Sequence, residues 1–290
     1  MTCGQEAFFS ERPRLLGLAY RVLGSLVDAE DVVQDVWIRW SATEQNTIER
    51  PAAWLTTVTT RLALDRLKSA QRRREVYVGP WLPEPILTAA GPEETVEAAE
   101  TLTLGFLALL ERLDPTARVV FLLTDVFGYE SGEVAAAVGK TPAACRQIAS
   151  RARRRLRDAK PSKPTPGDRA VADRLLAALA GGDTHAAMRL MSDDVVLVTD
   201  GGPNRHAARA PVIGPLRVTR FLTNVARRIP PSVRIQPATI NAAAGFHLND
   251  PARQQDGAIA IDVTDGLVSA IWVVTNPDKL THIGTPIAIT

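Results

Sequence analysis

The chain has 290 residues, and its 34 Lys and Arg against 32 Asp and Glu give a formal net charge of +2. The length allows two or three domains that each bury a core, and the balanced charge excludes a general polyanion binder. Charged residues interrupt every apolar run and the first residues lack a signal-peptide layout, so we expect a cytoplasmic protein without a membrane segment.

The residue pattern gives no support to metal or cofactor chemistry. The two cysteines, Cys3 and Cys145, suit neither a disulfide framework nor a metal site, and Cys145 is interpreted as a small core residue. The four histidines are scattered and show no HxxH or HExxH spacing. We therefore expect no metal and no cofactor.

Residues 5–74 contain three segments with helical periodicity. Pro13 is expected to bend or restart the first, and Asp28 is expected to cap the second, whose exposed side is acidic and amide-bearing. The polar residues 41–50 predict a loop. Pro51 then starts a third helix that ends in a cluster of basic residues.

Helical periodicity stops between Glu75 and Pro92. Six Gly and Pro residues in this stretch exclude a continuous helix and predict an extended linker. Its apolar residues, Trp81 and Leu82 among them, could dock on another part of the protein, and the prolines reduce the cost of ordering a docked segment. A plain tether is the alternative.

A helical pattern returns at about residue 93 and is divided at Asp114-Pro115, where one helix ends and the next begins. The following stretch, Ser131–Arg157, predicts a helix-turn-helix. Ser131 and Thr141 are placed as the two N-caps, and Gly139 ends the first helix.

The second helix of this pair sorts its residues by face. Its inward positions follow helical spacing: Cys145, Ile148, Ala149, Ala152 and Leu156. Its exposed side is small or hydrogen-bonding at first and then densely basic, with six arginines in the dozen residues from Arg146 and no acid before Asp158. This gradient suits a helix that reaches base edges with its first turns and neutralises phosphates with its later arginines. A solvated, charge-rich helix is the alternative.

The composition changes after a Pro-rich hinge at residues 160–167. Helices are predicted at 168–180, directly after an Asp183 cap, and around 215–228. Strand chemistry is found at 195–199, 233–238, 258–263 and 267–274, with Thr264-Asp265-Gly266 as a hairpin turn. This order predicts an α+β cone around an interior cavity.

The helical part of the chain resembles bacterial RNA polymerase sigma factors of the extracytoplasmic-function group. The resemblance to sigma domain two rests on LAYRVLGSLVDAEDVVQDVWIRW and PAAWLTTVTTRLALDRLKS. The resemblance to sigma domain four rests on LDPTARVVFLLTDVFGYESGEVAAAVGKTPAACRQIASRARRRLR. It implies two all-α domains, with the core polymerase and promoter DNA as partners.

The resemblance also assigns roles to single residues. The implied polymerase contacts are Asp31, Gln34, Asp35 and Trp37. The implied contacts of domain two with unpaired promoter bases are Asn46, Trp54, Arg61, Asp65 and Arg66, although a Trp in this setting is also typical of a core residue. In domain four the implied base-facing residues are Ala143, Ala144, Arg146 and Gln147, and the implied phosphate contacts are Lys140, Ser150, Arg151, Arg153 and Arg154.

The linker sequence WLPEP at 81–85 resembles the signature of the subgroup that carries a fused C-terminal SnoaL-like domain. The last part of the chain resembles that nuclear-transport-factor-two-like fold through short motifs at 181–183, 200–202, 211–214 and 276–280. The loop that usually reads Asp-Gly-Gly-Gly-Lys is DGGPN at 200–204 here, so it lacks a glycine and the lysine. The expected boundaries are domain two at 1–75, a linker at 76–95, domain four at 96–160, a hinge at 161–167 and the SnoaL-like domain at 168–290.

The leading hypothesis is a promoter-specific initiation factor and not an enzyme. Its third domain is expected to regulate the sigma domains through an intramolecular contact with them or with the linker. The residues expected in that contact are Trp81, Leu82, Pro83, Asp200, Asn276, Pro277, Asp278, Lys279 and Leu280. The alternative is a small-molecule sensor or a cyclase or isomerase that uses Asp200, His206 or His282. The sequence does not reveal whether an anti-sigma partner exists.

Overall fold

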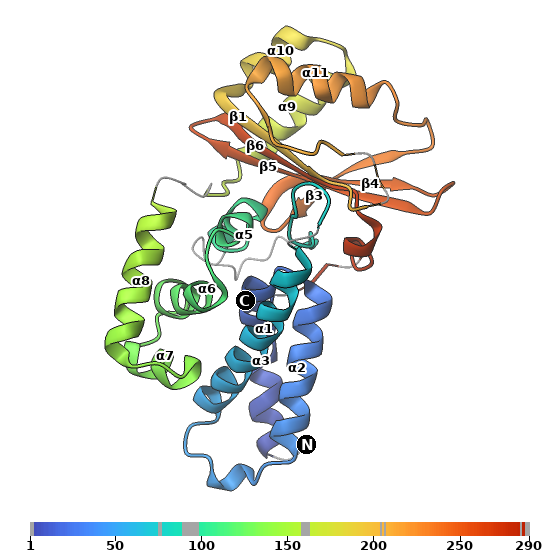
Figure 1. Cartoon of the computed structure of the whole chain (residues 1–290). Coiled ribbons are helices and arrows are strands. Elements are labelled where there is room, and N and C mark those ends of the chain that lie inside the picture. The colour runs from blue at the N-terminus through green and yellow to red at the C-terminus, as the bar shows by residue number, and fades with distance from the viewer. Residues whose placement is uncertain are drawn as a thin grey trace. The chain divides into compact units, whose positions relative to one another are not determined.

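The computed structural model describes residues 3–74, 77–88, 99–157, 163–203, 205, 207–284 and 286–287. Its contacts divide the chain into two compact units (Figure 1). The helical unit combines Met1–Val76 with Leu107–Lys160, and the sheet unit combines Tyr77–Phe106 with Pro161–Ile287. Residues 77–106, which sequence analysis divided between a linker and domain four, therefore pack with the C-terminal part of the chain.

The helical unit begins with three long helices, α1 (Cys3–Leu23), α2 (Leu26–Ser41) and α3 (Pro51–Arg74), and a short 3₁₀ turn, η1 (Gln45–Thr47). α1 continues through Pro13, so the helix does not restart at that residue. Ser25, and not Asp28, caps α2: its hydroxyl accepts a hydrogen bond from the Asp28 backbone N–H at 3.2 Å. Asp28 thus lies one turn inside the helix, where its carboxylate is free to pair elsewhere.

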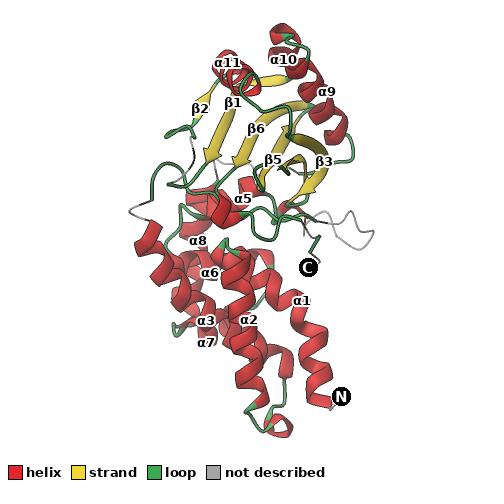
Figure 2. Ribbon diagram, turned by 90° about the vertical axis from the view of Figure 1, so that its right-hand side faces the viewer, coloured by secondary structure: helices red, strands yellow, loops and turns green. Residues whose placement is uncertain are grey.

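The rest of the helical unit consists of short helices that lead to the predicted helix-turn-helix. These are α5 (Leu104–Leu110, whose first three residues belong to the sheet unit), α6 (Pro115–Phe121), a π turn η2 (Leu122–Val126), α7 (Ser131–Val138) and α8 (Pro142–Leu156) (Figure 2). The predicted helix start at Asp114-Pro115 is confirmed, and Asp114 caps α6. The predicted Ser131 cap is wrong by one residue, since Glu130 caps α7 in a reciprocal box with Glu133.

The turn between α7 and α8 agrees with the sequence prediction in detail. Gly139 ends α7 with φ +66°, a left-handed conformation that suits glycine. The Thr141 hydroxyl accepts a hydrogen bond from the Ala144 backbone N–H at 3.2 Å, with Pro142 in the first turn. The start and direction of α8 are therefore set by local sequence.

The sheet unit has six strands in the order β2-β1-β6-β5-β4-β3, all antiparallel to their neighbours except the parallel pair β1 and β6. The strands are β1 (Met191–Asp200), β2 (Val212–Ile213), β3 (Arg234–Ile240), β4 (Ala243–Asp250), β5 (Gln255–Thr264) and β6 (Leu267–Val274). The helices α9 (Asp168–Ala180), α10 (Thr184–Arg189) and α11 (Pro215–Ala226) lie together over one face of the sheet (Figures 1 and 2). This is the predicted α+β arrangement.

Four of the six strands were predicted. The predicted hairpin turn, Thr264-Asp265-Gly266, includes one residue too many, because Thr264 pairs with Leu267. Asp265 and Gly266 connect β5 to β6 with φ values of 53° and 76°, as a two-residue hairpin loop requires. Sequence analysis missed β4, whose residues AAGFHLND have low strand propensity and follow β3 after a two-residue turn. It also missed β2, which has two residues only.

The two faces of the sheet pack against different partners. Ile261 and Ile271 belong to the hydrophobic core formed with α9, α10 and α11. On the opposite face, a Cβ placed on Gly105 would lie 2.4 Å from the Asp262 carboxylate and 3.3 Å from the Trp272 ring. The segment Tyr77–Phe106 therefore contributes to the same folded unit as the sheet.

Candidate nucleic-acid interface

Helix α8 presents the mixed polar and basic face that its sequence predicts. Cys145, Ala149, Ala152 and Leu156 are buried, and Ile148 is half-buried. Burial raises the pKa of the Cys145 thiol. The candidate DNA contacts Lys140, Ala143, Arg146, Gln147, Ser150, Arg151, Arg153 and Arg154 are exposed, and Ala144 is half-buried. One continuous surface thus carries small and amide side chains at its start and arginines toward its end.

One of these arginines already has an acidic partner. The Arg153 Nε donates to the Asp125 carboxylate at 2.5 Å, and this hydrogen bond and charge raise the pKa of Arg153. Asp125 lies in the π turn that precedes α7. Arg146, Arg151 and Arg154 have no ion pair in the described part of the chain. They can neutralise an approaching phosphate without first breaking a contact.

The candidate polymerase-binding residues of α2 differ in how they are held. Arg66 on α3 donates to Asp28 at 2.8 Å and to Asp31 at 2.5 Å. Its partial burial opposes the charge, but the two carboxylates outweigh that effect and raise the pKa of Arg66. Arg66 was expected to contact DNA and Asp31 to contact the polymerase, and the structure joins them to each other. Asp35, in contrast, is exposed and forms no ion pair among the described residues.

Gln34 and Trp37 lie on the same helix as Asp35. Gln34 is exposed, and Trp37 is half-buried against Phe8 and Phe9, with ring centroids 4.9 and 5.3 Å apart. Phe9 is 49% exposed, although its type predicts burial. Together these side chains line a groove between α1 and α2. The exposed Phe9 ring beside the half-buried Trp37 and the exposed Gln34 forms a suitable surface for a protein partner.

The remaining domain-two candidates are partly engaged within the helical unit. Trp54 is half-buried, with its ring centroid 5.3 Å from that of Trp40, so it has a core role as well as an exposed edge. Arg61 donates to the backbone carbonyls of Ala136 (2.8 Å) and Ala137 (3.3 Å) at the end of α7. Asp65 is exposed and lies 3.6 Å from Lys68. The Asn46 side chain is outside the described residues.

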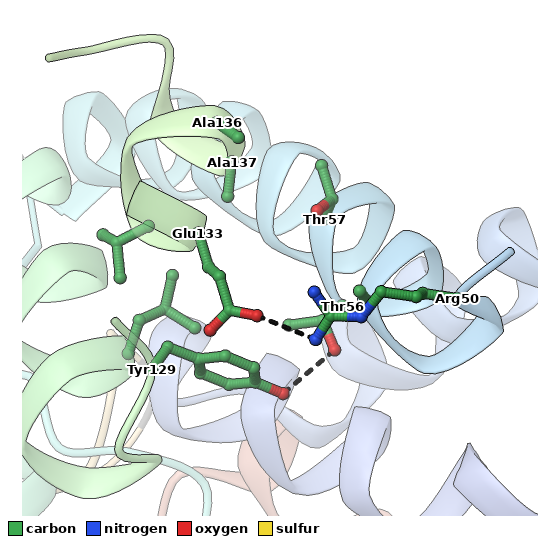
Figure 3. A pocket seen from close by; sticks show the side chains of 10 residues that line it. Arg50, Thr56, Thr57, Tyr129, Glu133, Ala136 and Ala137 are labelled. Carbon is green, nitrogen blue, oxygen red and sulfur yellow. Dashed lines mark hydrogen bonds and ion pairs between the residues drawn. The ribbon is translucent and has the colours of Figure 1, made fainter. Parts of the chain in front are cut away.

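Further polar contacts join α1 and α3 to the segment before α7 (Figure 3). Arg14 donates to the Tyr129 hydroxyl at 2.6 Å and to the Thr56 hydroxyl at 2.8 Å, and these two hydroxyls are 3.1 Å apart. Arg50 forms an exposed ion pair with Glu133 at 3.2 Å. Arg50, Thr56, Tyr129 and Glu133 line a pocket of about 160 Å³ between α3 and α7. Sequence analysis missed Arg14 and Tyr129, because their pairing joins positions that are 115 residues apart.

In the sheet unit, the linker residues 81–85 contact the two loops named in the sequence analysis. We call this cluster the latch: Tyr77, Leu82, Asp200, Asn276 and Lys279. The buried Asp200 carboxylate accepts hydrogen bonds from the Tyr77 hydroxyl (2.6 Å), the Leu82 N–H (2.8 Å), the Gly202 N–H (3.0 Å) and Lys279 Nζ (2.7 Å). Four donors satisfy a carboxylate completely. Asp200 is therefore a structural anchor for the linker.

Lys279 is the second anchor of the latch. Its ammonium group also donates to the Leu82 carbonyl and lies 4.0 Å from the centroid of the Trp81 ring. The Asn276 amide donates to the Tyr77 hydroxyl at 2.8 Å. Burial and the adjoining Asp200 carboxylate raise the pKa of Tyr77, so its hydroxyl stays protonated. Pro83, which follows Leu82, and Leu280, which follows Lys279, are buried. Pro277 and Asp278 are exposed.

A second site holds the continuation of the linker. The Ile86 N–H donates to the Asn241 side chain at 2.9 Å, and the Ile86 carbonyl accepts from the Asn241 N–H at 2.9 Å. Thr88 N–H donates to the Thr239 carbonyl at 3.0 Å. Leu82 and Ile86 are each 1% exposed, so the segment is embedded and not a plain tether. Asn241, which has φ 51° and adopts a left-handed turn, was missed by the sequence analysis.

The groups proposed for catalysis do not form a common site in the described residues. Asp200 is occupied by the linker, His282 is exposed, and His206 lies outside the described residues. Arg205, which follows the loop that lacks the usual lysine, donates to Gln255 at 2.7 Å. No group of three metal-ligating side chains occurs in the part of the chain that the structure describes. None of its described helices is both long and apolar enough to cross a membrane.

Comparison with known proteins gives two family matches and several full-length relatives. Residues 8–73 match the family model of sigma-70 region 2, and residues 104–156 match that of sigma-70 region 4. The ECF RNA polymerase sigma factor SigJ of Mycobacterium tuberculosis is 40% identical over 295 residues, which cover 97% of this chain and 93% of that protein. A probable ECF RNA polymerase sigma factor SigI of the same species is 28% identical over 279 residues, covering 94% and 93%. The crystal structure of M. tuberculosis SigJ aligns with a TM-score of 0.80 at 36% identity, covering 96% of this chain and 98% of that one.

Proposed function

The chain belongs to the extracytoplasmic-function RNA polymerase sigma factors, and we propose that it directs core polymerase to promoters that α8 reads as duplex DNA. The observation that carries this proposal is the face of α8, where Arg146 and Gln147 precede the exposed Arg151 and Arg154. Arg and Gln side chains suit base edges, and the later arginines suit phosphates. Opening of the DNA and RNA synthesis then depend on the polymerase that the factor recruits.

Run-off transcription tests this proposal. Purified chain, core polymerase from the organism of origin and genomic DNA fragments should give transcripts with defined start sites. Core polymerase alone serves as the control and should not start at those sites. Absence of any factor-dependent start site, with core polymerase that is active on other templates, would contradict the proposal.

The polymerase contact is proposed at Gln34, Asp35 and Trp37. Support comes from the carboxylate of Asp35, which is exposed and forms no ion pair among the described residues, and from the groove between α1 and α2 that Gln34 and Trp37 line. Asp35→Lys should weaken capture of core polymerase. Asp31→Lys is a poorer test, because it would also break the ion pair with Arg66 inside the helical unit. Asp65→Lys, an exposed substitution with the same charge change, is the matched control.

We also propose that the sheet unit regulates the factor by holding its linker, and that it is not a catalyst. The support is the latch, in which Asp200 and Lys279 are both buried and both bonded to the linker. While these bonds persist, residues 77–88 cannot extend, which limits how far domains two and four can separate. A cyclase or isomerase that uses Asp200 would need that carboxylate free, so turnover of a small molecule by the full chain would contradict this assignment.

A further inference from the structure

The sheet unit carries a strongly basic surface that the sigma-factor assignment does not use. Residues 201–249 contain seven arginines and no Asp or Glu. Those arginines are Arg205, Arg209, Arg217, Arg220, Arg227, Arg228 and Arg234. In contrast, the other residues of 168–290 contain eleven Asp and five Lys or Arg. Basic and acidic residues of this unit are therefore separated along the sequence. Solubility alone does not require this separation, because a surface with interspersed charges is also soluble.

Four of these arginines fall on one side of α11 and its C-terminal turn. Arg217, Arg220 and Arg227 are three and seven residues apart, so they lie within about 80° of one another around the helix axis, and Arg228 is adjacent. All four are exposed, as is Asn224 between them. Val218 and Leu222 lie about 100° and 140° around the axis from Arg217, and on that side α11 packs on the core of the sheet unit. The exposure of these four arginines places the arginine face at the surface of the sheet unit, and α11 lies on the helix-covered side of the sheet (Figure 1).

None of these four arginines has an ion pair within the described residues. Exposed arginines without acidic partners repel one another, and a polyanion removes that repulsion. The face is about 15 Å long from Arg217 to Arg227, or between four and five base pairs of duplex, at ~1.5 Å per helical residue and ~3.4 Å per base pair. Guanidinium groups bind phosphates with paired hydrogen bonds.

The covalent connection to α8 keeps the sheet unit within reach of the phosphates of the DNA that α8 binds. Leu156 ends α8 and Asp168 begins α9, so the two are 168 − 156 = 12 residues apart. Fully extended, this segment spans at most about 40 Å, or ~12 base pairs. Whenever α8 is bound to a promoter, the sheet unit is therefore confined to the neighbourhood of the same duplex, where the effective concentration of phosphates is high.

We propose that this arginine face of α11, formed by Arg217, Arg220, Arg227 and Arg228, binds the phosphate backbone of duplex DNA next to the element read by α8. The inference rests on the proposed sigma function. The contact carries no base specificity, because the face offers arginines without a neighbouring set of groups that would read base edges. It adds affinity that falls with salt concentration, and it gives the sheet unit a role on the promoter that is separate from the latch.

The test is a salt titration of promoter binding by holoenzyme reconstituted with the full chain. The variant is Arg217→Gln, Arg220→Gln and Arg227→Gln combined. Each lost phosphate contact lowers the slope of log affinity against log salt by about 0.9, so the slope should fall by about 2.7. The matched control changes three exposed arginines outside α11 and outside the proposed polymerase and promoter contacts, Arg112, Arg174 and Arg253, to Gln and should keep the wild-type slope.

The outcomes separate this inference from the sigma function itself. If the triple α11 variant keeps the wild-type slope, or if the control variant loses as much, the proposed DNA contact is wrong. If the α11 variant instead loses capture of core polymerase at an unchanged slope, the face binds protein and the inference is again wrong. If wild-type holoenzyme gives neither binding nor transcription, the sigma function fails first. Run-off transcription by the wild type is therefore measured in the same series.

Discussion

The α8 face and the latch are both built around cations, yet their surroundings differ completely. On α8, Arg146 and Arg151 are exposed and unpaired in the described chain. In the latch, the side chain of Lys279 is 8% exposed and that of Asp200 is 0% exposed, and each has several hydrogen-bond partners. A cation that is open to solvent costs little and is available to a ligand, whereas a buried one must be satisfied internally. The exposed cations of α8 are therefore suited to binding a ligand, whereas the buried cation of the latch is suited to holding the linker in place.

The latch should give the largest effect when it is broken. Lys279→Met leaves the Asp200 carboxylate buried without its cation, which costs about 3–5 kcal/mol. The linker should then open locally, and the amides of Leu82 and Ile86 should lose protection in hydrogen exchange. Hydrogen exchange is the suitable measurement, because a chain with two units does not unfold in a single step.

The control for this prediction is Lys163→Met in the same unit. Lys163 pairs with Glu100, but its side chain is 72% exposed, so the pair is worth about 0–1 kcal/mol. Protection of Leu82 and Ile86 should remain at the wild-type level. Equal loss in both variants would mean that the latch stabilises the linker no more than a surface ion pair does.

The second effect concerns α8 and distinguishes base contacts from phosphate contacts. Arg146→Ala should weaken promoter binding by holoenzyme by about 1–3 kcal/mol and relax the preference at one base position. Arg154→Ala should weaken binding to all sequences alike and lower the salt slope by about 0.9. If Arg146→Ala reduces binding equally on every sequence, Arg146 is a phosphate contact.

Sequence analysis predicted the local features of both regions more reliably than their contacts. The Thr141 cap, the Gly139 turn and the inward face of α8 depend on residues within one or two turns, and the structure confirms them. The approach of residues 81–85 to Asp200 was expected only from the subgroup resemblance. Tyr77, Asn241, Arg14 and Tyr129 were missed, because their partners lie 42 to 199 residues away and no periodicity reports such pairs.

The third effect tests how firmly the domain-four segment is held on α1 and α3. Tyr129→Phe removes the hydroxyl that contacts Arg14 and Thr56. A hydrogen bond to a charged group is worth about 1.5–3 kcal/mol when buried, and partial exposure reduces this to about 1 kcal/mol. Hydrogen exchange in α7 should then accelerate about fivefold.

Thr57→Ala is the matched control for this prediction. Thr57 lines the same pocket, so its truncation changes the same surface without removing the Tyr129 hydroxyl (Figure 3). Exchange in α7 should stay at the wild-type rate. Opening of α7 would also release Arg61 from the carbonyls of Ala136 and Ala137, which makes it available to unpaired promoter bases.

The smallest expected effect comes from releasing Arg153 of α8 from its ion pair, so that it becomes unpaired, as Arg151 and Arg154 are in the described chain. Asp125 holds Arg153 in an ion pair in which the Arg153 side chain is still 55% exposed. Asp125→Asn keeps the shape of the turn but removes the charge that competes with phosphate. Promoter binding should therefore become a few-fold tighter, and its salt slope should steepen by up to about 0.9. Asp265→Asn removes one negative charge from an exposed turn of the sheet unit and should leave both quantities unchanged. If both variants tighten binding equally, general charge and not the release of Arg153 explains the gain, and the distinction between open and occupied cations on α8 has no consequence for DNA binding.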